Sequence, residues 1–213
     1  MEILPKNHHY VPIWYQKRFM LPRQEKYFYL NINPGGSRDT KGNFHRHQDL
    51  YRHGPKFCFC EKDFYSLEFG TGKSMDIEKY FFGSIDDRGS IAVENFSNYG
   101  IKPEIHKSFR DFLLFISSQK LRTPKGLSWI SKELGINNKL KLLNKMVELR
   151  NLYCAIWTES VWQIADASLS ETKFIVSDHP VAVYNRVCGP QWSKRHGDPD
   201  IRLNATHTLF PMS

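Results

Sequence analysis

Cysteine is scarce in this sequence, and long apolar runs are missing from it. The four cysteines among 213 residues are Cys58, Cys60, Cys154 and Cys188, too few for a disulfide framework in a chain of this length. The N-terminal segment MEILPKNHHY has no apolar signal region, and no apolar run approaches the roughly 20 residues that a membrane span needs. We therefore expect a cytoplasmic protein with reduced thiols and no membrane partner.

Acidic residues are also outnumbered. The sequence has 30 Lys and Arg against 22 Asp and Glu, a formal net charge of +8. Two stretches hold the excess: residues 1–56 carry 10 basic against 4 acidic residues and residues 105–155 carry 10 against 3, whereas residues 57–104 carry 5 against 9. This distribution permits an anionic partner such as nucleic acid but does not require one.

The chain has β-type sequence on both sides of a helical block. We expect one α+β domain over residues 1–213, in which N- and C-terminal strands form a sheet around at least three helices within residues 73–155. Aromatic and aliphatic residues alternate over Tyr27–Ile32 and predict a strand that enters a hairpin at the turn residues 33–36.

The next stretch has little pattern. Residues 37–55 are polar and indicate irregular structure, and a further strand is expected at Lys56–Cys60, closed by Asp63–Ser66.

Helical spacing marks four segments of the chain. They are Ile13–Phe19 after Pro12, residues 77–96 with interruptions near Gly83 and Gly89, residues 109–122, and Leu140–Tyr153. In the third, Phe109, Phe112, Leu113 and Ile116 form an i, i+3, i+4, i+7 stripe, which predicts a helix with one buried face. Pro124 ends that helix.

The stretch Thr172–Tyr184, TKFIVSDHPVAVY, places two apolar β-branched runs around a polar knot. This pattern predicts a strand, a tight loop and a second strand. The carboxylate of Asp178 and the imidazole of His179 then lie at the mouth of the strand pair, where chemistry often occurs. We expect Leu209–Phe210 to pair into the same sheet as Phe174–Val176.

Four short motifs follow one another along the chain. They are His8–Pro12 with Tyr15 and Phe19, Asp63–Ser66, Leu121–Pro124, and Phe174–Pro180. Together they resemble the family known as domain of unknown function 4238. The chain departs from the family pattern at His179, where Asn is common, and at Gln16, where Leu is common. The resemblance implies a site but no activity. Members continue past Leu209–Ser213, so a C-terminally truncated member is one interpretation.

The histidines and Asp178 are the candidate catalytic residues. His8 and His9 lie on opposite sides of an extended segment, so one of them can face a given pocket. If that residue meets Asp178 and His179, the cluster provides a general base with an orienting carboxylate, or ligands for a divalent metal. The structural alternative is a buried His–Asp hydrogen bond that ties the two ends of the chain together.

A nuclease pattern is a further alternative for the N-terminal motif. The motif His9–Pro12 resembles the first element of ββα-metal nucleases, in which a histidine in a hairpin activates water beside a metal. Such a site needs an Asn and a further His, and the chain offers Asn33 or Asn43 with His45 or His47. These residues are expected in irregular loop rather than on a helix, which disfavours the pattern.

Two other patterns are incomplete. Gly70–Ser74 resembles a phosphate-binding loop but has Leu67 where the pattern requires glycine. Cys58 and Cys60 share one face of a strand, yet no second cysteine pair has the spacing of a structural zinc site.

Basic residues gather in the helical block. They are Lys120, Arg122, Lys125, Lys132, Lys139, Lys141, Lys145 and Arg150, and Trp129 among them can stack on a base. Lys17, Arg18, Arg122 and Lys125 are the candidate substrate-binding residues. Two functions remain open: a hydrolase, metal-dependent or with a His/Asp base, that acts on nucleic acid or another phosphodiester, or a non-catalytic basic module that binds nucleic acid or an acidic protein partner.

Overall fold

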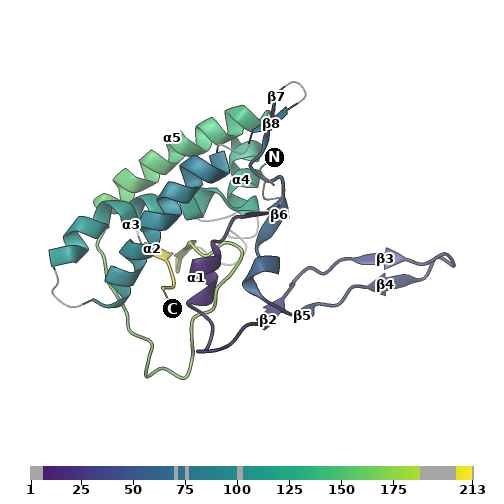
Figure 1. Cartoon of the computed structure of the whole chain (residues 1–213), viewed down its shortest axis with the longest axis horizontal. Helices are drawn as coiled ribbons and strands as arrows, with labels where there is room; N and C mark the ends of the chain where they lie inside the picture. Colours follow the sequence, from purple (N-terminus) through teal and green to yellow (C-terminus); the bar gives the residue numbers. More distant parts are fainter. Residues whose placement is uncertain (1–6, 70–71, 75–76, 100–102, 188–204, 213) are drawn as a thin grey trace.

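The computed structural model describes residues 7–69, 72–74, 77–99, 103–187 and 205–212. A body of helices is crossed by short strands, and a long two-stranded hairpin projects from one side of it (Figure 1). The α+β class is confirmed. The strands do not form one sheet, however: within the described residues they form five separate two-stranded antiparallel sheets.

Among the described residues, five α-helices make up the body. They are α1 (Ile13–Lys17), α2 (Gly83–Ser97), α3 (Pro103–Leu121), α4 (Pro124–Leu134) and α5 (Lys139–Thr158), with a 3-10 turn at Pro55–Phe57 and a π-helical turn at Ile77–Phe82. The expected helices at residues 13–19, 109–122 and 140–153 are confirmed as α1, α3 and α5. α4 was not expected from the spacing.

Local sequence explains where α3 stops and α4 starts and ends. Thr123 is the N-cap of α4, where its hydroxyl accepts a hydrogen bond from the amide of Gly126, and Pro124 takes the first helical position. Gly135 ends α4 in the left-handed conformation, with φ of 63°. The polar Thr–Pro boundary therefore separates two helices rather than a helix and a loop.

The glycines of α2 do not interrupt it. The helix runs through Gly89, which is buried against α3. A Cβ at this position would lie 2.6 Å from the ring of Phe115. Gly89 is thus a contact point between two helices, and the expected break there is wrong.

The strands pair as follows: β1 (Asn7–His9) with β6 (Cys60–Lys62), β2 (Tyr27–Leu30) with β5 (Leu50–His53), β3 (Gly36–Arg38) with β4 (Phe44–Arg46), β7 (Leu67–Phe69) with β8 (Gly72–Ser74), and β9 (Ala182–Asn185) with β10 (Thr206–Leu209). The expected strand at Tyr27–Ile32 is confirmed. The hairpin turn is not at residues 33–36, because the chain continues outward to Asp39–Gly42 before it returns.

Two expectations at the N-terminal end are therefore wrong. Residues 37–55 are not irregular but form most of the hairpin, whose strands are polar because both faces of its outer part meet water. The strand expected at Lys56–Cys60 begins only at Cys60, because Pro55 starts a 3-10 turn.

The C-terminal strands also differ from expectation. Residues 173–177 join no ladder, whereas β9 forms after Pro180. Leu209 pairs with Ala182, so the expected pairing of Leu209–Phe210 with Phe174–Val176 is wrong. An apolar β-branched run predicts extended backbone but does not identify its partner.

The core consists of two clusters of buried side chains. One joins the N-terminal motif to α4 and α5 and includes Tyr15, Tyr65 and Ile130, and the other lies between α2, α3 and the end of α5. Phe210 packs against both clusters, and its ring stacks on that of Tyr15 at 5.2 Å. The stripe predicted on α3 is confirmed, since Phe112, Leu113 and Ile116 are buried.

Candidate functional site

His8 is a buried residue of the first motif. It lies in β1 with its side chain fully buried, its Nδ1 accepts a hydrogen bond of 2.9 Å from the amide of Tyr65, and its ring stacks on the Tyr65 ring. Burial lowers the pKa of His8, and the neighbouring Asp63 carboxylate opposes that shift. The neutral ring carries its proton on Nε2, an atom without a hydrogen-bond partner within the described part of the chain.

His9 faces the other way, as the alternation of an extended segment requires. It is half-buried, and its Nε2 lies 3.3 Å from the carbonyl oxygen of Lys56. Burial lowers the pKa of His9 as well, and hydrogen bonding to the Lys56 and Pro55 backbone opposes the shift. This residue holds β1 against the turn that precedes β6.

His179 is buried at the start of α4. Its Nδ1 lies 2.6 Å from the hydroxyl of Thr123, and its Nε2 lies 3.1 Å from Nζ of Lys120. Because an ammonium group only donates, Nε2 is the acceptor and the neutral ring donates from Nδ1. Lys120 also donates to the carbonyl oxygen of Val181 at 3.1 Å. His179 therefore joins the helix boundary to the strand β9.

Asp178 is exposed and lies on the other side of its loop, near two tyrosines of the first cluster. Burial raises the pKa of Tyr10, and the carboxylates of Asp178 and Glu61 add to that effect. Burial and the Asp178 carboxylate also raise the pKa of Tyr29. A shared site of His8 or His9 with Asp178 or His179 stays a prediction. The hydrogen bonds described above join the three histidines to other groups and not to one another.

The four motifs do meet, through a set of contacts that we call the motif junction. The Tyr65 amide donates to His8, and the Tyr65 hydroxyl donates to the carbonyl oxygen of Arg122 at 2.6 Å. Gln119 donates to the carbonyl oxygen of Tyr10 at 2.7 Å. Thr123 then bonds to His179 (above). Residues from all four motifs are thus linked by hydrogen bonds that are mostly buried, as expected of polar groups shielded from water.

Arg122 is the centre of the junction and is unsuited to bind a substrate. Its side chain is buried, its Nη1 and Nη2 lie 3.1 Å and 2.9 Å from the two carboxylate oxygens of Asp86, and its Nε and Nη2 donate to Oε1 of Gln119. The guanidinium also lies over the ring of Phe82. Burial raises the pKa of Asp86, and the guanidinium opposes that shift. Asp86 and Gln119 were not expected from the sequence: no spacing marks Asp86, a partner 36 residues away, and the position of Gln119, three residues before Arg122, was not identified as a contact.

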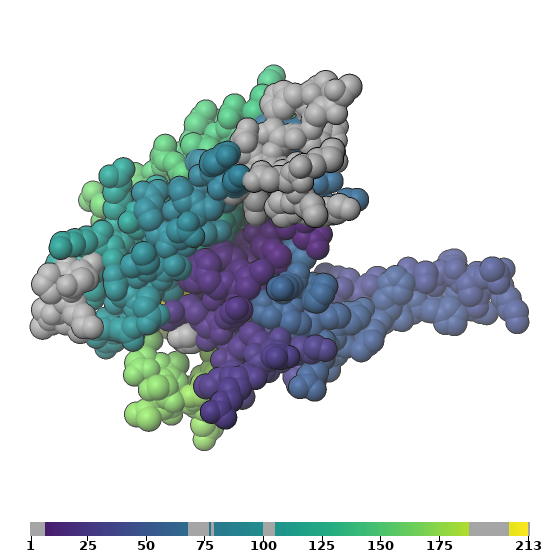
Figure 2. All heavy atoms as spheres, viewed as in Figure 1, coloured from purple at the N-terminus to yellow at the C-terminus, as the bar shows by residue number. Residues whose placement is uncertain are grey.

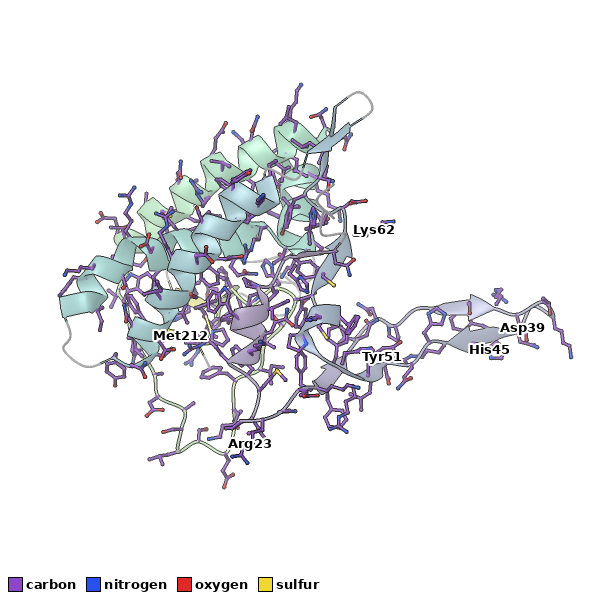
Figure 3. The ribbon with its side chains drawn as sticks, viewed as in Figure 1. Arg23, Asp39, His45, Tyr51, Lys62 and Met212 are labelled. Carbon is purple, nitrogen blue, oxygen red and sulfur yellow. The ribbon has the colours of Figure 1, made fainter. Side chains whose placement is uncertain are left out.

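Of the other candidate substrate-binding residues, Arg18 is bonded within the chain, whereas Lys17 and Lys125 lie at the surface. Arg18 donates to the carbonyl oxygen of Met212 at 2.6 Å and to Ser97, and it forms an ion pair with Glu94, so it fastens α1 to α2 and to the C-terminal segment (Figure 3, where Met212 is labelled). Lys17 and Lys125 are exposed. These two lysines stay candidates for contact with an anion.

Metal ligation finds little support in the part of the chain that the structure describes. No group of three or more His, Cys, Asp or Glu side chains there is arranged to hold a metal ion. His45 and His47 lie in the projecting hairpin, where His45 pairs with Asp39 at 3.1 Å and His47 contacts Ser37. Residues 70 and 71 of the glycine-rich stretch lie outside the described residues.

A groove of about 430 Å³ opens beside α4 and the start of α5. It is lined by Lys62, Asp63, Phe64, Pro124, Leu127, Ser128, Ser131, Lys139, Leu142 and Leu143. Its floor is apolar, and its rim carries two lysines, of which Lys139 donates to the carbonyl oxygen of Asp63. Ser128 and Ser131 of the groove were not predicted from the sequence because α4 itself was not expected. The capping residues Thr123 and Gly135, with Pro124, were sufficient to predict that helix.

The comparisons with known proteins define the family. Residues 7–156 match the family described as Protein of unknown function (DUF4238), and the chain belongs to that family. No curated protein and no solved structure matches the chain. None of the helices within the described residues has the length and apolarity to cross a membrane.

Proposed function

We propose that this protein is a non-catalytic binding module for single-stranded nucleic acid and that α4 with its groove is the interface. The observation that carries the proposal is an exposed row on α4 formed by Lys125, Trp129 and Lys132. Their i, i+4, i+7 spacing places them on one face of the helix. The opposite face buries Leu127 and Ile130 in the core, so this row points to solvent.

Single-stranded nucleic acid requires a cationic track and an aromatic surface. Trp129 is 37% exposed between its two lysines, and a base that stacks on an exposed aromatic ring gains about 1–3 kcal/mol. Lys62 and Lys139 on the groove rim extend the positive charge away from α4. The groove volume falls within the range of about 300–1,000 Å³ typical of small-ligand sites, and the groove lies along another face of α4 from Trp129, lined by Leu127, Ser128 and Ser131.

The geometry of the candidate catalytic residues favours a binding role over a hydrolytic one. Arg122 and His179 are buried within the motif junction, and Nδ1 of His8 accepts a hydrogen bond from the backbone amide of Tyr65. A general base must reach a substrate proton through a hydrogen bond or one water. Residues buried in this way are better placed to hold the four motifs together than to exchange a proton with a substrate.

Fluorescence anisotropy with labelled oligo(dT) and oligo(U) of about 20 nucleotides tests the proposal, using the full chain at low salt and over a salt titration. Trp129→Ala is expected to weaken binding at least fivefold, and Lys132→Glu to weaken binding and reduce the salt slope by about 0.7. Lys107→Glu, an exposed residue of α3, is the matched charge control and should have a smaller effect. Absent binding, or equal losses in all three variants, would overturn the proposed interface.

Hydrolysis is the second candidate, and one observation favours it. Nε2 of His8 is buried without a hydrogen-bond partner among the described residues, an uncommon state for a polar atom in a folded protein. Cleavage of labelled DNA and RNA in the presence of Mg²⁺ or Mn²⁺ tests this function. Cleavage that is lost in His8→Asn, which keeps an acceptor for the Tyr65 amide, would support it, whereas no cleavage by the wild-type chain excludes it for these substrates.

A further inference from the structure

The hairpin of residues 27–53 presents two chemically different faces. Paired residues of an antiparallel ladder share a face, and the observed pairs are Phe28 with Arg52, Leu30 with Leu50, and Arg38 with Phe44. The hydrogen bond from the Asn31 amide to Asp49 adds one pair to the inner ladder, and the outer ladder follows with its register offset by two residues. Even-numbered residues pair with even-numbered residues in both ladders and share one side within each, and we call these sides, together with Ile32 after the inner ladder, the even face.

The odd-numbered side is occupied near the body. Tyr27 and Tyr29 pack against the core, where Tyr27 donates to Gln16 and Tyr29 contacts the ring of Phe59. The even face consequently points away from the body. Figure 2 shows the hairpin standing clear of the rest of the chain on the side drawn, and Figure 3 shows Asp39 and His45 near its tip and Tyr51 near its base.

The even face is both apolar and cationic. Its exposed apolar residues are Phe28, Leu30, Ile32, Phe44 and Leu50, and its arginines are Arg38, Arg46 and Arg52. Phe28 is 71% exposed and Ile32 is 80% exposed. Large apolar side chains gathered on one side of a projecting element mark an interaction surface, because a two-stranded ribbon has no second layer with which to cover them.

One residue fixes this surface in a defined shape. The ring of Phe44 lies across the backbone of Gly36, in the space that any Cβ at that position would fill. The aromatic ring thus covers the glycine and is held flat on the ribbon. A surface that is ordered before binding loses less conformational entropy when a partner arrives.

We propose that the even face docks a partner protein that presents an apolar strip flanked by carboxylates, such as the face of an acidic amphipathic helix. The charges select the partner: the charged side chains on the even face are arginines, and the odd-numbered Asp49 places one carboxylate near them, 3.8 Å from Arg46. Arginine and aromatic residues are the types enriched in the cores of protein interfaces. Arginine also binds carboxylates through paired hydrogen bonds.

The same features disfavour two other occupants. A second copy of the chain in a symmetric dimer would place the same face against itself, which would bring the arginines of both copies together. Nucleic acid would pair with the arginines but would leave Leu30, Ile32 and Leu50 without a matching surface, since aliphatic side chains provide no stacking platform of the kind that aromatic residues offer to bases. The proposed surface is separate from the α4 groove, and neither proposal depends on the other.

A fluorescein-labelled acidic amphipathic peptide of about 20 residues is the probe, since shorter helices are marginal in water. Its leucines are spaced i, i+3, i+4, i+7 with glutamates on both flanks, and a control peptide has the same residues in scrambled order. Anisotropy with the full chain is expected to show saturable binding of the first peptide and at least tenfold weaker binding of the second.

Three variants of the chain locate the binding. The triple variant R38Q/R46Q/R52Q should weaken binding at least tenfold, and Ile32→Ser, outside the strand ladder, should weaken it severalfold. Lys107→Gln is the charge control and Trp129→Ala the control for the α4 groove; both should bind the peptide as the wild type does. Each variant should unfold at the wild-type Tm, which would show that its fold is intact.

Several results would overturn the proposal. These are no preference for the amphipathic peptide, equal binding by the triple variant and the wild type, and tighter binding of duplex or single-stranded oligonucleotides through the same three arginines. A dimer in analytical ultracentrifugation that Ile32→Ser dissociates would assign the even face to a second copy and would overturn it as well.

Discussion

Arginine serves opposite purposes in the motif junction and in the hairpin. Arg122 is enclosed by Asp86, Gln119 and an aromatic ring, so its donors are used within the chain. In the hairpin, Arg38 donates to the carbonyl oxygen of Gly42, and Arg46 lies 3.8 Å from Asp49 at the surface. A buried ion pair is strongly destabilising to break, whereas an exposed pair contributes about 0–1 kcal/mol.

The two regions also treat apolar side chains differently. In the body, Phe112 is buried and stacks on Phe96 at 4.3 Å. On the hairpin, Phe28 contributes its ring to the solvent-exposed even face. The buried contacts that stabilise this chain therefore lie in its body, while the hairpin holds apolar side chains that only a partner would bury.

The largest expected effect is that of Arg122→Ala. The change leaves the partly buried carboxylate of Asp86 without its cation and removes two donors from Gln119, and we expect a loss of about 5 kcal/mol in the free energy of unfolding. Urea denaturation measures it. Arg38→Ala on the hairpin is the control and should change the free energy by less than about 0.5 kcal/mol. Similar losses in both variants would remove the distinction between the two regions.

Phe112→Ala is expected to be nearly as damaging. Loss of the buried ring removes transfer free energy and leaves a cavity between α2 and α3, at a cost of about 3–5 kcal/mol. Calorimetry would show this as a lower Tm with an otherwise cooperative transition. A cost below about 1 kcal/mol would mean that the neighbouring rings collapse into the space.

The motif junction should also respond to pH through His8. Its pKa in the folded chain is lowered from the usual 6.5 by burial, so the unfolded chain binds the proton more readily. The contribution to stability is complete above pH 6.5 and is lost as the pH falls through the lowered pKa, by at most about 1.4 kcal/mol per pH unit. His8→Asn keeps an acceptor for the Tyr65 amide and should flatten the dependence between pH 7 and 5. An unchanged slope in urea titrations would assign it to another group.

The smallest effect is expected for Phe28→Ser. Because this ring is exposed on the even face, its removal should alter the free energy of unfolding by less than about 0.5 kcal/mol. The same change should reduce nonspecific association at high concentration, as light scattering would show. A loss of several kcal/mol would place Phe28 in a folded-state contact rather than in a docking surface.

Sequence alone predicted the helices better than the strands. The stripe on α3 was sufficient because Phe112, Leu113 and Ile116 repeat with the helical period and are buried, in a helix whose C-terminal half, residues 115–121, is buried on its other faces as well. A hairpin after Tyr27–Ile32 was expected, but its outer part was missed for the opposite reason: both faces there meet water, so residues 37–46 show no alternation. A strand without a buried face carries a weak pattern.

The candidate site was predicted only in part. The motifs that drew attention do meet, but mainly through backbone groups of Tyr10, Tyr65 and Arg122, which carry no side-chain signature. The residue that binds Arg122 is Asp86, which sits within an ordinary helical stretch. Hydrogen bonds of this kind depend on tertiary placement, and local spacing does not reveal them.

The position of Phe210 sets an order of events during synthesis. Its ring completes the packing around Tyr15, whose hydroxyl donates to the carbonyl oxygen of Pro211, a contact across 196 positions of the chain. At about 5–20 residues per second, α1 leaves the ribosome roughly 10–40 s before the segment that covers it. During this interval the aromatic side of α1 is available to chaperones.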